Sequence, residues 1–324
     1  MEIINKKVDS FFILLNTIVK TKPYFVIIIL HEYFRNLYKE DPYLKFSEKN
    51  HKKRIINTLD NLIKLLKILN KVRSYKIDFD NNEIESDLRK KSSKIFSKIF
   101  IKKNNNNHSI NYFKSLKSLG LEKKYFKNKI ILDAGTGAGR HAVLISKLGV
   151  KKIIAVDHKI SINQNLKLKY PKNIYFREAD VQNLQFKTSE FDFINCYGVL
   201  HHTNNIEKGL KELLRVLKKG GYLYLYIYGS GGVYWNSRKK MNKLFQSIPQ
   251  YYTKNVLKII NMPINRFVFE DCWYAPIEKY TSQKKLEEIL RRLKVQSFKK
   301  LRDKVVEENK FIWGDGELKY LITK

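Results

Sequence analysis

Acidic and glycine residues that suit cofactor chemistry meet in one short stretch, Asp-Ala-Gly-Thr-Gly-Ala-Gly-Arg at positions 133–140. The apolar run 130–132 before it predicts a buried strand, and the alternating glycines predict a tight turn that opens a helix. Such glycines let the backbone pass close to a ligand, where any Cβ atom would collide with it, and an acidic residue at the strand end can hold an amine or hydroxyl group. The stretch therefore predicts a nucleotide-type cofactor site, and an ordinary strand-to-helix turn is the alternative.

Two more acidic residues stand where later strands are predicted to end. Asp157 follows the apolar run 153–156, about twenty residues after the glycines, which suits a carboxylate that accepts both ribose hydroxyls. Asp180 follows a third predicted strand over 174–179. Because ligands on open parallel sheets bind at the carboxyl ends of the strands, these positions favour a binding site over isolated turn residues.

Short apolar runs alternate with helical periodicity through the rest of this region, which predicts parallel strands joined by helical crossovers. The segment Thr-Ser-Gln-Lys at 281–284 predicts a helix cap before the helical residues 286–290. Tyr197 ends the predicted fourth strand, at the same edge as the three acidic residues. The remaining predicted elements are helices over 109–119, 141–148 and 206–217, a turn over 218–221, and strands over 191–197, 222–228, 295–301 and 318–323.

The spacing Asp-x-Gly-x-Gly-x-Gly resembles motif I of the class I S-adenosylmethionine-dependent methyltransferases. The segments Val-Leu-His-His-Thr at 199–203 and Glu-Leu-Leu-Arg-Val-Leu-Lys-Lys-Gly-Gly at 212–221 resemble the type 11 group, which includes the ubiquinone and menaquinone methylases. The resemblance covers residues 112–230, and Lys219 stands where that group usually has proline. It implies an α/β, doubly wound, Rossmann-like seven-stranded sheet, mostly parallel with the last strand antiparallel, and S-adenosylmethionine as cofactor.

The resemblance also implies roles for individual residues. Asp157 is expected on the ribose hydroxyls and Asp180 on the adenine amino group, with the next backbone amide facing the ring. The residues predicted to bind the cofactor are Asp133, Gly135, Thr136, Gly137, Gly139, Arg140, Asp157, His158, Asp180, Val181, Cys196 and Tyr197.

Methyl transfer from a sulfonium is an in-line displacement, which needs alignment and, for a weakly acidic nucleophile, a base, but no metal. His201 follows the fourth strand and is the candidate base, while packing of the loop is the alternative role for the histidine pair. Aromatic residues expected to line the acceptor pocket are Tyr197, Tyr228, Tyr234 and Trp235, with core packing equally open for Tyr228.

The formal net charge is +33, from 64 Lys and Arg against 31 Asp and Glu. Residues 1–110 hold 23 basic and 12 acidic residues (+11), and residues 111–324 hold 41 and 19 (+22), so the charge density is the same in both parts. Uniform basicity with abundant Lys, Asn, Ile and Tyr is typical of an AT-rich coding sequence. Compositional drift is therefore favoured over selected binding to an anionic partner as the origin of the charge.

Two cysteines, Cys196 and Cys272, give neither a disulfide framework nor a zinc-ligand set, so a reducing, cytoplasmic location is expected. The apolar runs 11–15 and 24–30 are divided by charged residues and a proline. Neither approaches the roughly 20 residues that span a bilayer. No transmembrane segment or signal peptide is expected, and peripheral membrane contact stays open.

Outside the sheet, the sequence predicts a helical N-terminal extension over 1–103, an Asn-rich linker over 104–108 and a methyltransferase domain over 109–324 with a lid insertion at about 229–280. A helix over 51–73 carries one apolar stripe and a lysine-rich back, which favours a core-facing helix over a membrane-surface helix. The most basic run, 89–98, is a candidate phosphate contact, although a solvated helix face is favoured.

Three functions remain open. The favoured one is methylation of a small-molecule acceptor, with a hydroxyl of a sugar, lipid-linked compound or secondary metabolite as target. The second is methylation of RNA such as tRNA or rRNA, which the charge supports, although Asn195-Cys196-Tyr197-Gly198 differs from the motifs that grip a base amine. The third is a methyltransferase-like subunit without turnover, against which the intact acidic residues argue. The acceptor and the oligomeric state do not follow from the sequence.

Overall fold

The computed structural model describes residues 2–38, 48–71, 106–158, 170–250, 252–253 and 273–324. The basic run 89–98, Cys272 and the first part of the predicted linker lie outside these residues. The chain divides into two compact units, each discontinuous in sequence. A helical unit contains residues 1–84, 230–274 and 303–316, and a sheet unit contains residues 85–229, 275–302 and 317–324.

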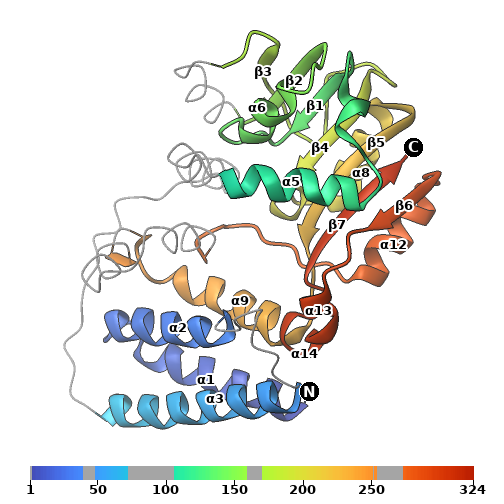
Figure 1. Ribbon diagram of the computed structural model, residues 1–324. Coiled ribbons are helices and arrows are strands. Elements are labelled where there is room, and N and C mark those ends of the chain that lie inside the picture. The colour runs from blue at the N-terminus through green and yellow to red at the C-terminus, as the bar shows by residue number, and fades with distance from the viewer. Residues whose placement is uncertain (1, 39–47, 72–105, 159–169, 251, 254–272) are drawn as a thin grey trace. The chain divides into compact units, whose positions relative to one another are not determined.

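The sheet unit is built on seven strands in the order β3-β2-β1-β4-β5-β7-β6 (Figure 1). Strands β1 to β5 pair in parallel, and β7 is antiparallel to both β5 and β6. The predicted fold class is confirmed. The strands are β1 (Ile130–Ala134), β2 (Lys152–Asp157), β3 (Ile174–Glu178), β4 (Phe191–Tyr197), β5 (Leu217–Tyr228), β6 (Ser297–Lys300) and β7 (Glu317–Thr323).

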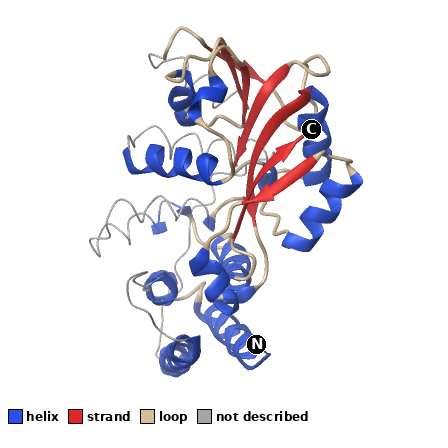
Figure 2. Ribbon diagram, turned by 45° about the vertical axis from the view of Figure 1, so that its right-hand side comes forward, coloured by secondary structure: helices blue, strands red, loops and turns tan. Residues whose placement is uncertain are grey.

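Helices cover both faces of this sheet (Figure 2). One apolar cluster buries the leucines of α8 (Ile206–Val216) and α12 (Gln283–Arg292) against the strands. A second cluster on the other face includes Tyr112 and Leu116 of α5 (Asn106–Ser118) and Ile145 of α6 (Arg140–Ser146). Ser282 accepts a hydrogen bond from the Lys285 amide and caps α12, within the segment 281–284 that the sequence predicts as a cap. The two clusters fix the sheet between layers of helices.

The fifth strand begins earlier than the sequence predicts. Residues 218–221, predicted as a turn, lie inside β5 as an irregularity in its pairing with β4. Phe191 pairs with Leu217 and Phe193 with Tyr222, so the residues between them form a bulge. Glycine suits the bulge because Gly220 has φ of +72°, a backbone conformation that other residues rarely adopt.

The helical unit contains α1 (Glu2–Ile18), α2 (Pro23–Tyr38), α3 (Glu48–Lys71), α9 (Gly232–Phe245), α13 (Lys304–Glu308) and α14 (Lys310–Trp313). The apolar face of α3 is buried at Ile55, Leu59 and Leu66, while Lys53 and Lys64 on its back are exposed. This is the core-facing arrangement that the sequence favours. None of the described helices is long and apolar enough to cross a membrane.

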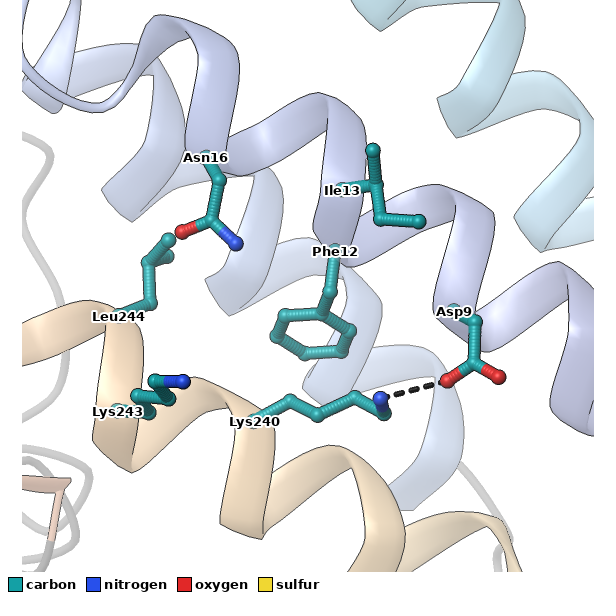
Figure 3. Close-up of a pocket in the computed structure, with 7 residues that line it drawn as sticks. All are labelled: Asp9, Phe12, Ile13, Asn16, Lys240, Lys243 and Leu244. Atoms are coloured by element: carbon teal, nitrogen blue, oxygen red, sulfur yellow. Dashed lines mark ion pairs between the residues drawn. The ribbon is translucent and has the colours of Figure 1, made fainter.

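A groove of about 430 Å³ lies in the helical unit between α1 and α9 (Figure 3). Lys240 forms an ion pair with Asp9 across it, with 2.5 Å between Nζ and Oδ1. None of the residues predicted to bind cofactor lines it. The lining residues are Asp9, Phe12, Ile13, Asn16, Lys240, Lys243 and Leu244.

Candidate cofactor site

The carboxyl ends of β1, β2, β3 and β4 bring four predicted site residues to one edge of the sheet. Asp133 lies near the end of β1 and Asp157 ends β2, and these strands are direct neighbours. Asp180 follows β3, which pairs with β2, and Tyr197 ends β4, which pairs with β1. This edge is where open parallel sheets bind their ligands.

The glycine turn joins β1 to α6 in the way that the spacing predicts. Gly135, Gly137 and Gly139 have φ of +75°, +53° and +71°, a backbone region that glycine adopts without strain. The Gly135 and Thr136 amides each donate to the carbonyl oxygen of Val156 at 2.9 Å, which ties the turn to β2.

Gly135 has a packing role that the sequence does not reveal. A Cβ atom there would lie 2.2 Å from the Cγ2 atom of Val199, so this glycine makes room for the loop after β4. At Gly139 a Cβ atom would lie 3.0 Å from the Tyr170 ring. Both contacts are within the protein, and cofactor contact at these two positions stays a prediction.

Asp157 holds the glycine turn from the neighbouring strand. Its Oδ2 accepts from the Gly137 amide at 2.6 Å, and its Oδ1 accepts from the His158 amide at 2.7 Å. The carboxylate is half-buried, so it lies beside the turn with part of its surface accessible. Its placement suits a hydrogen-bond acceptor for a ligand that lies over the turn.

Asp133 is buried in a chain of side-chain hydrogen bonds. Its Oδ2 accepts from the Thr136 hydroxyl and its Oδ1 from Nδ2 of Asn195, both at 2.6 Å. The Tyr112 hydroxyl donates in turn to Oδ1 of Asn195 at 3.0 Å. Burial raises the pKa of Asp133 to about 6, against the hydrogen bonds from Thr136 and Asn195, which lower it. Only 1% of Asp133 is exposed. Its hydrogen bond with Thr136 therefore holds the glycine turn from the buried side of the sheet edge.

The other predicted cofactor residues differ in accessibility. Asp180 is half-buried and accepts from the Gln182 amide at 2.9 Å, in a turn just past β3, while Val181 beside it is buried. Arg140 begins α6, and burial lowers its pKa. Cys196 is fully buried, and burial raises the pKa of its thiol.

Tyr197 lies in a cluster of aromatic rings on the face covered by α5 and α6. Its ring centroid is 4.8 Å from His141 and 4.7 Å from Tyr226. Tyr112 and Tyr224 also contact it, with centroids 6.3 and 5.8 Å away. The cluster continues the sheet edge from the glycine turn toward β5 and β7.

His201 packs in the loop after β4. It is 0% exposed, and its ring stacks on Tyr228 with centroids 3.5 Å apart and planes at 19°. Its Nδ1 accepts a hydrogen bond from the Tyr228 amide at 3.2 Å, so a neutral ring carries its proton on Nε2. These contacts favour the packing role over that of a base. The neighbouring His202 donates from Nδ1 to the carbonyl oxygen of Ile277 at 2.8 Å.

The aromatic residues that the sequence groups as an acceptor pocket come from both units. Tyr197 and Tyr228 belong to the sheet unit, whereas Tyr234 and Trp235 belong to α9 of the helical unit. Tyr234 contacts Phe34 there, with ring centroids 6.2 Å apart. Their role in acceptor binding stays a prediction.

Several residues near this edge escape the sequence analysis. Asn195 and Tyr112 complete the network around Asp133, and Lys319 and Glu317 of β7 reach the tyrosine cluster. The sequence holds one sign of this network, the polar Asn195 inside a mostly apolar strand. Among the described residues, no cluster of His, Cys, Asp and Glu suits a metal ion.

The chain resembles known methyltransferases in the part that forms this site. Residues 132–225 match a family described as a methyltransferase domain. A protein of Encephalitozoon cuniculi named as a methyltransferase is 29% identical over 137 residues, 41% of this chain and 59% of that protein. A tRNA U34 carboxymethyltransferase of Campylobacter fetus is 34% identical over 106 residues, 31% of this chain and 36% of that protein.

The YcgJ protein of Bacillus subtilis, named as an uncharacterized methyltransferase, is 31% identical over 99 residues, 29% of this chain and 39% of that protein. Its crystal structure gives a TM-score of 0.42 at 15% identity, covering 67% of this chain and 97% of that chain. The chain thus spans less than two thirds of the length of each of these curated relatives. With the sheet order, the glycine turn and the acidic strand ends, the family match identifies residues 132–225 as part of a class I S-adenosylmethionine-dependent methyltransferase domain.

Proposed function

We propose that this protein transfers a methyl group from S-adenosylmethionine to a small-molecule acceptor, with an acceptor oxygen as the nucleophile. The observation that carries the proposal is the convergence of the glycine turn with Asp157 and Asp180 at one sheet edge. When bound, the cofactor supplies an electrophilic methyl group on a sulfonium. The two accessible carboxylates suit its ribose hydroxyls and its adenine amine.

The chain's own residues act chiefly by alignment. The buried Asp133 network fixes the turn, and Asp157 fixes it from β2, so contacts within the protein preorganise the turn. Such preorganisation lowers the entropic cost of in-line attack. Tyr197 ends β4, Tyr226 lies two residues before the end of β5, and both offer ring faces that favour a positive sulfur.

His201 as general base rests on the sequence alone. Its complete burial and its hydrogen bond with the Tyr228 amide support another role, in which His201 holds the loop after β4 in place. An acceptor whose oxygen is already acidic needs no base in the active site.

Methylation of RNA is the second candidate. It is supported by the tRNA U34 carboxymethyltransferases among the relatives and by the net charge of +33. The aligned segment covers only 36% of the Campylobacter fetus enzyme, and the charge is spread evenly along this chain. Both observations favour the small acceptor. A methyltransferase-like subunit without turnover of its own is the third candidate. The expected cytoplasmic location of the protein stays a prediction.

The test is a methyl-transfer assay with S-adenosylmethionine labelled in its methyl group. Wild-type protein is incubated with a small-metabolite extract and, separately, with total RNA across an ionic-strength series, and Asp157→Ala serves as the cofactor-site control. We expect label in small molecules, with little dependence on salt, and RNA binding that falls steeply as salt rises. Label in a defined RNA species and none in small molecules, with RNA binding that persists at about 0.2 M salt, would promote the second candidate.

A further inference from the structure

A lysine of β7 lies beside the tyrosine cluster at the carboxyl edge of the sheet. Lys319 pairs in register with Tyr226 of β5, which pairs in register with Tyr197 of β4. Register partners on adjacent strands point to the same face, so the three side chains form one row. The Nζ atom lies 5.3 Å from the Tyr226 ring centroid and 5.9 Å from that of Tyr197.

This lysine keeps its positive charge in a largely buried place. Its side chain is 20% exposed, and its Nζ lies 2.5 Å from Oε2 of Glu317, whose side chain is 50% exposed. Burial alone would lower the pKa of Lys319, but the charge and hydrogen bond of Glu317 and the charges of Tyr197 and Tyr224 together outweigh it, and the pKa is raised. The Tyr226 hydroxyl donates to Oε1 of the same carboxylate at 2.9 Å. Glu317 thus holds Lys319 from the more exposed side, with both tyrosine rings against it.

The position of Lys319 assigns it to the acceptor rather than to the cofactor. The glycine turn, Asp157 and Asp180 belong to β1, β2 and β3, on one side of β4. Lys319 lies on the other side, two strands beyond β4. Lys319 contacts the ring of Tyr197, and that ring contacts His141. His141 lies in the first turn of α6, two residues after the last glycine of the turn. A group held at Lys319 therefore lies beyond the cofactor, where the acceptor must enter.

A cation at this point restricts what can be bound. The cofactor carries a positive sulfur, and Arg140 adds a second charge near Tyr197, whose pKa is raised by burial although Lys319 and Arg140 act to lower it. Further positive charge beside the sulfonium would weaken binding, and Glu317 already supplies one negative charge to this row. An oxyanion beside Lys319 and the edges of the tyrosine rings would add a second negative charge, held by charge-assisted hydrogen bonds.

We propose that Lys319 is a positioning residue that binds an oxyanion of the methyl acceptor. The acceptor is then a small molecule with a carboxylate or phosphate group, packed on the rings of Tyr197 and Tyr226. This inference rests on the proposed methyl-transfer function, because it takes the cofactor to lie over the glycine turn. It narrows the acceptor class from hydroxyl compounds in general to acidic ones.

The test measures binding to the full chain saturated with S-adenosylhomocysteine, by calorimetry and ligand-detected NMR. The probes are benzoate and phenyl phosphate as aromatic oxyanions, with benzamide and benzyl alcohol as neutral counterparts. The variants are Lys319→Met, Lys319→Arg and Glu317→Gln, and the matched control is Lys299→Met, an exposed lysine on the neighbouring strand β6.

Wild-type protein should bind at least one of the two anions about ten-fold or more tightly than the neutral probes. Lys319→Met should abolish this preference with S-adenosylhomocysteine affinity unchanged, whereas Lys319→Arg and Lys299→Met retain it. Glu317→Gln should strengthen anion binding, because it removes the carboxylate that competes for the ammonium. If Lys319→Met does not fold, the anion preference of the wild type and its rise in Glu317→Gln still decide the matter.

Three results would overturn the inference while leaving the proposed function intact. They are equal binding of anionic and neutral probes, an anion preference that survives in Lys319→Met, and no saturable binding of either anion to the loaded protein. Loss of S-adenosylhomocysteine affinity in Lys319→Met would instead place Lys319 in the cofactor site and would also contradict it. Failure of the wild type to bind S-adenosylhomocysteine would overturn the proposed function and this inference together.

Discussion

The side chain of Asn195 donates from Nδ2 to Oδ1 of Asp133 at 2.6 Å, and so links β4 to the strand that leads into the glycine turn. The two residues are partners in the parallel register of β1 and β4, and both are 1% exposed. The Tyr112 hydroxyl completes the link from α5. A glycine turn held in this way has little freedom to adopt other conformations.

Asn195→Leu should therefore destabilise the fold. It removes the donor to Asp133 and the acceptor of the Tyr112 hydroxyl, leaving two buried polar groups without their partner. We expect a loss of about 1–3 kcal/mol in the free energy of unfolding, measured by urea denaturation. The control is Asn183→Leu at an exposed site, which should change stability by less than about 0.5 kcal/mol. Equal stability of the two variants would contradict the account of the network.

The raised pKa of Asp133 predicts a pH-dependent stability. Between the ordinary pKa of 3.8 and the folded value of about 6, the folded protein binds a proton that the unfolded chain does not. The stability contributed by this proton is complete below pH 3.8 and is lost as the pH rises through 6. Relative to Asp133→Asn, the wild type should lose about 3 kcal/mol between about pH 4 and pH 6. A constant difference between the two proteins across this range would show that the carboxyl titrates normally.

The role of the histidine pair can be decided by matched substitutions. His201→Phe keeps a ring on Tyr228 but removes the acceptor of its amide, so we expect a loss of about 1–2 kcal/mol in unfolding free energy. Methyl transfer to the active metabolite fraction should stay within about ten-fold of the wild type, since a base is worth roughly 10²–10⁴-fold. His202→Phe, which changes the other histidine of the pair, is assayed for methyl transfer in the same way. A fall of that size in His201→Phe, with S-adenosylhomocysteine affinity unchanged, would restore His201 as the base.

Asp157 gives a direct test of the ribose position. Asp157→Ala should weaken S-adenosylhomocysteine binding by about 1–3 kcal/mol, because an acceptor is lost for the ligand and for the Gly137 amide. Glu288→Ala, an exposed carboxylate on α12, should bind like the wild type. Calorimetry that finds one affinity for all three proteins would remove Asp157 from the cofactor site.

Local patterns predict the strands and the acidic residues at their ends, because each depends on a few neighbouring positions. The contacts among these residues depend on tertiary register, which the sequence does not display. Asn195 meets Asp133 only because β4 lies beside β1, and Lys319 meets Tyr226 only because β7 returns antiparallel to β5. For the same reason the sequence does not reveal that Gly135 makes room for Val199. The early start of β5 depends on a bulge that apolar periodicity does not reveal.

The most direct test of the cofactor site is calorimetric titration of S-adenosylhomocysteine into the wild type, Gly137→Val and Gly220→Val. Both glycines have positive φ, so each substitution strains the backbone by about 1–3 kcal/mol, but Gly220 lies in the bulge of β5 with no other atom within 4 Å of its added Cβ. If the cofactor binds at the glycine turn after β1, S-adenosylhomocysteine should bind saturably to the wild type and to Gly220→Val. It should not bind to a folded Gly137→Val. Equal binding by both variants, or no binding by the wild type, would contradict it.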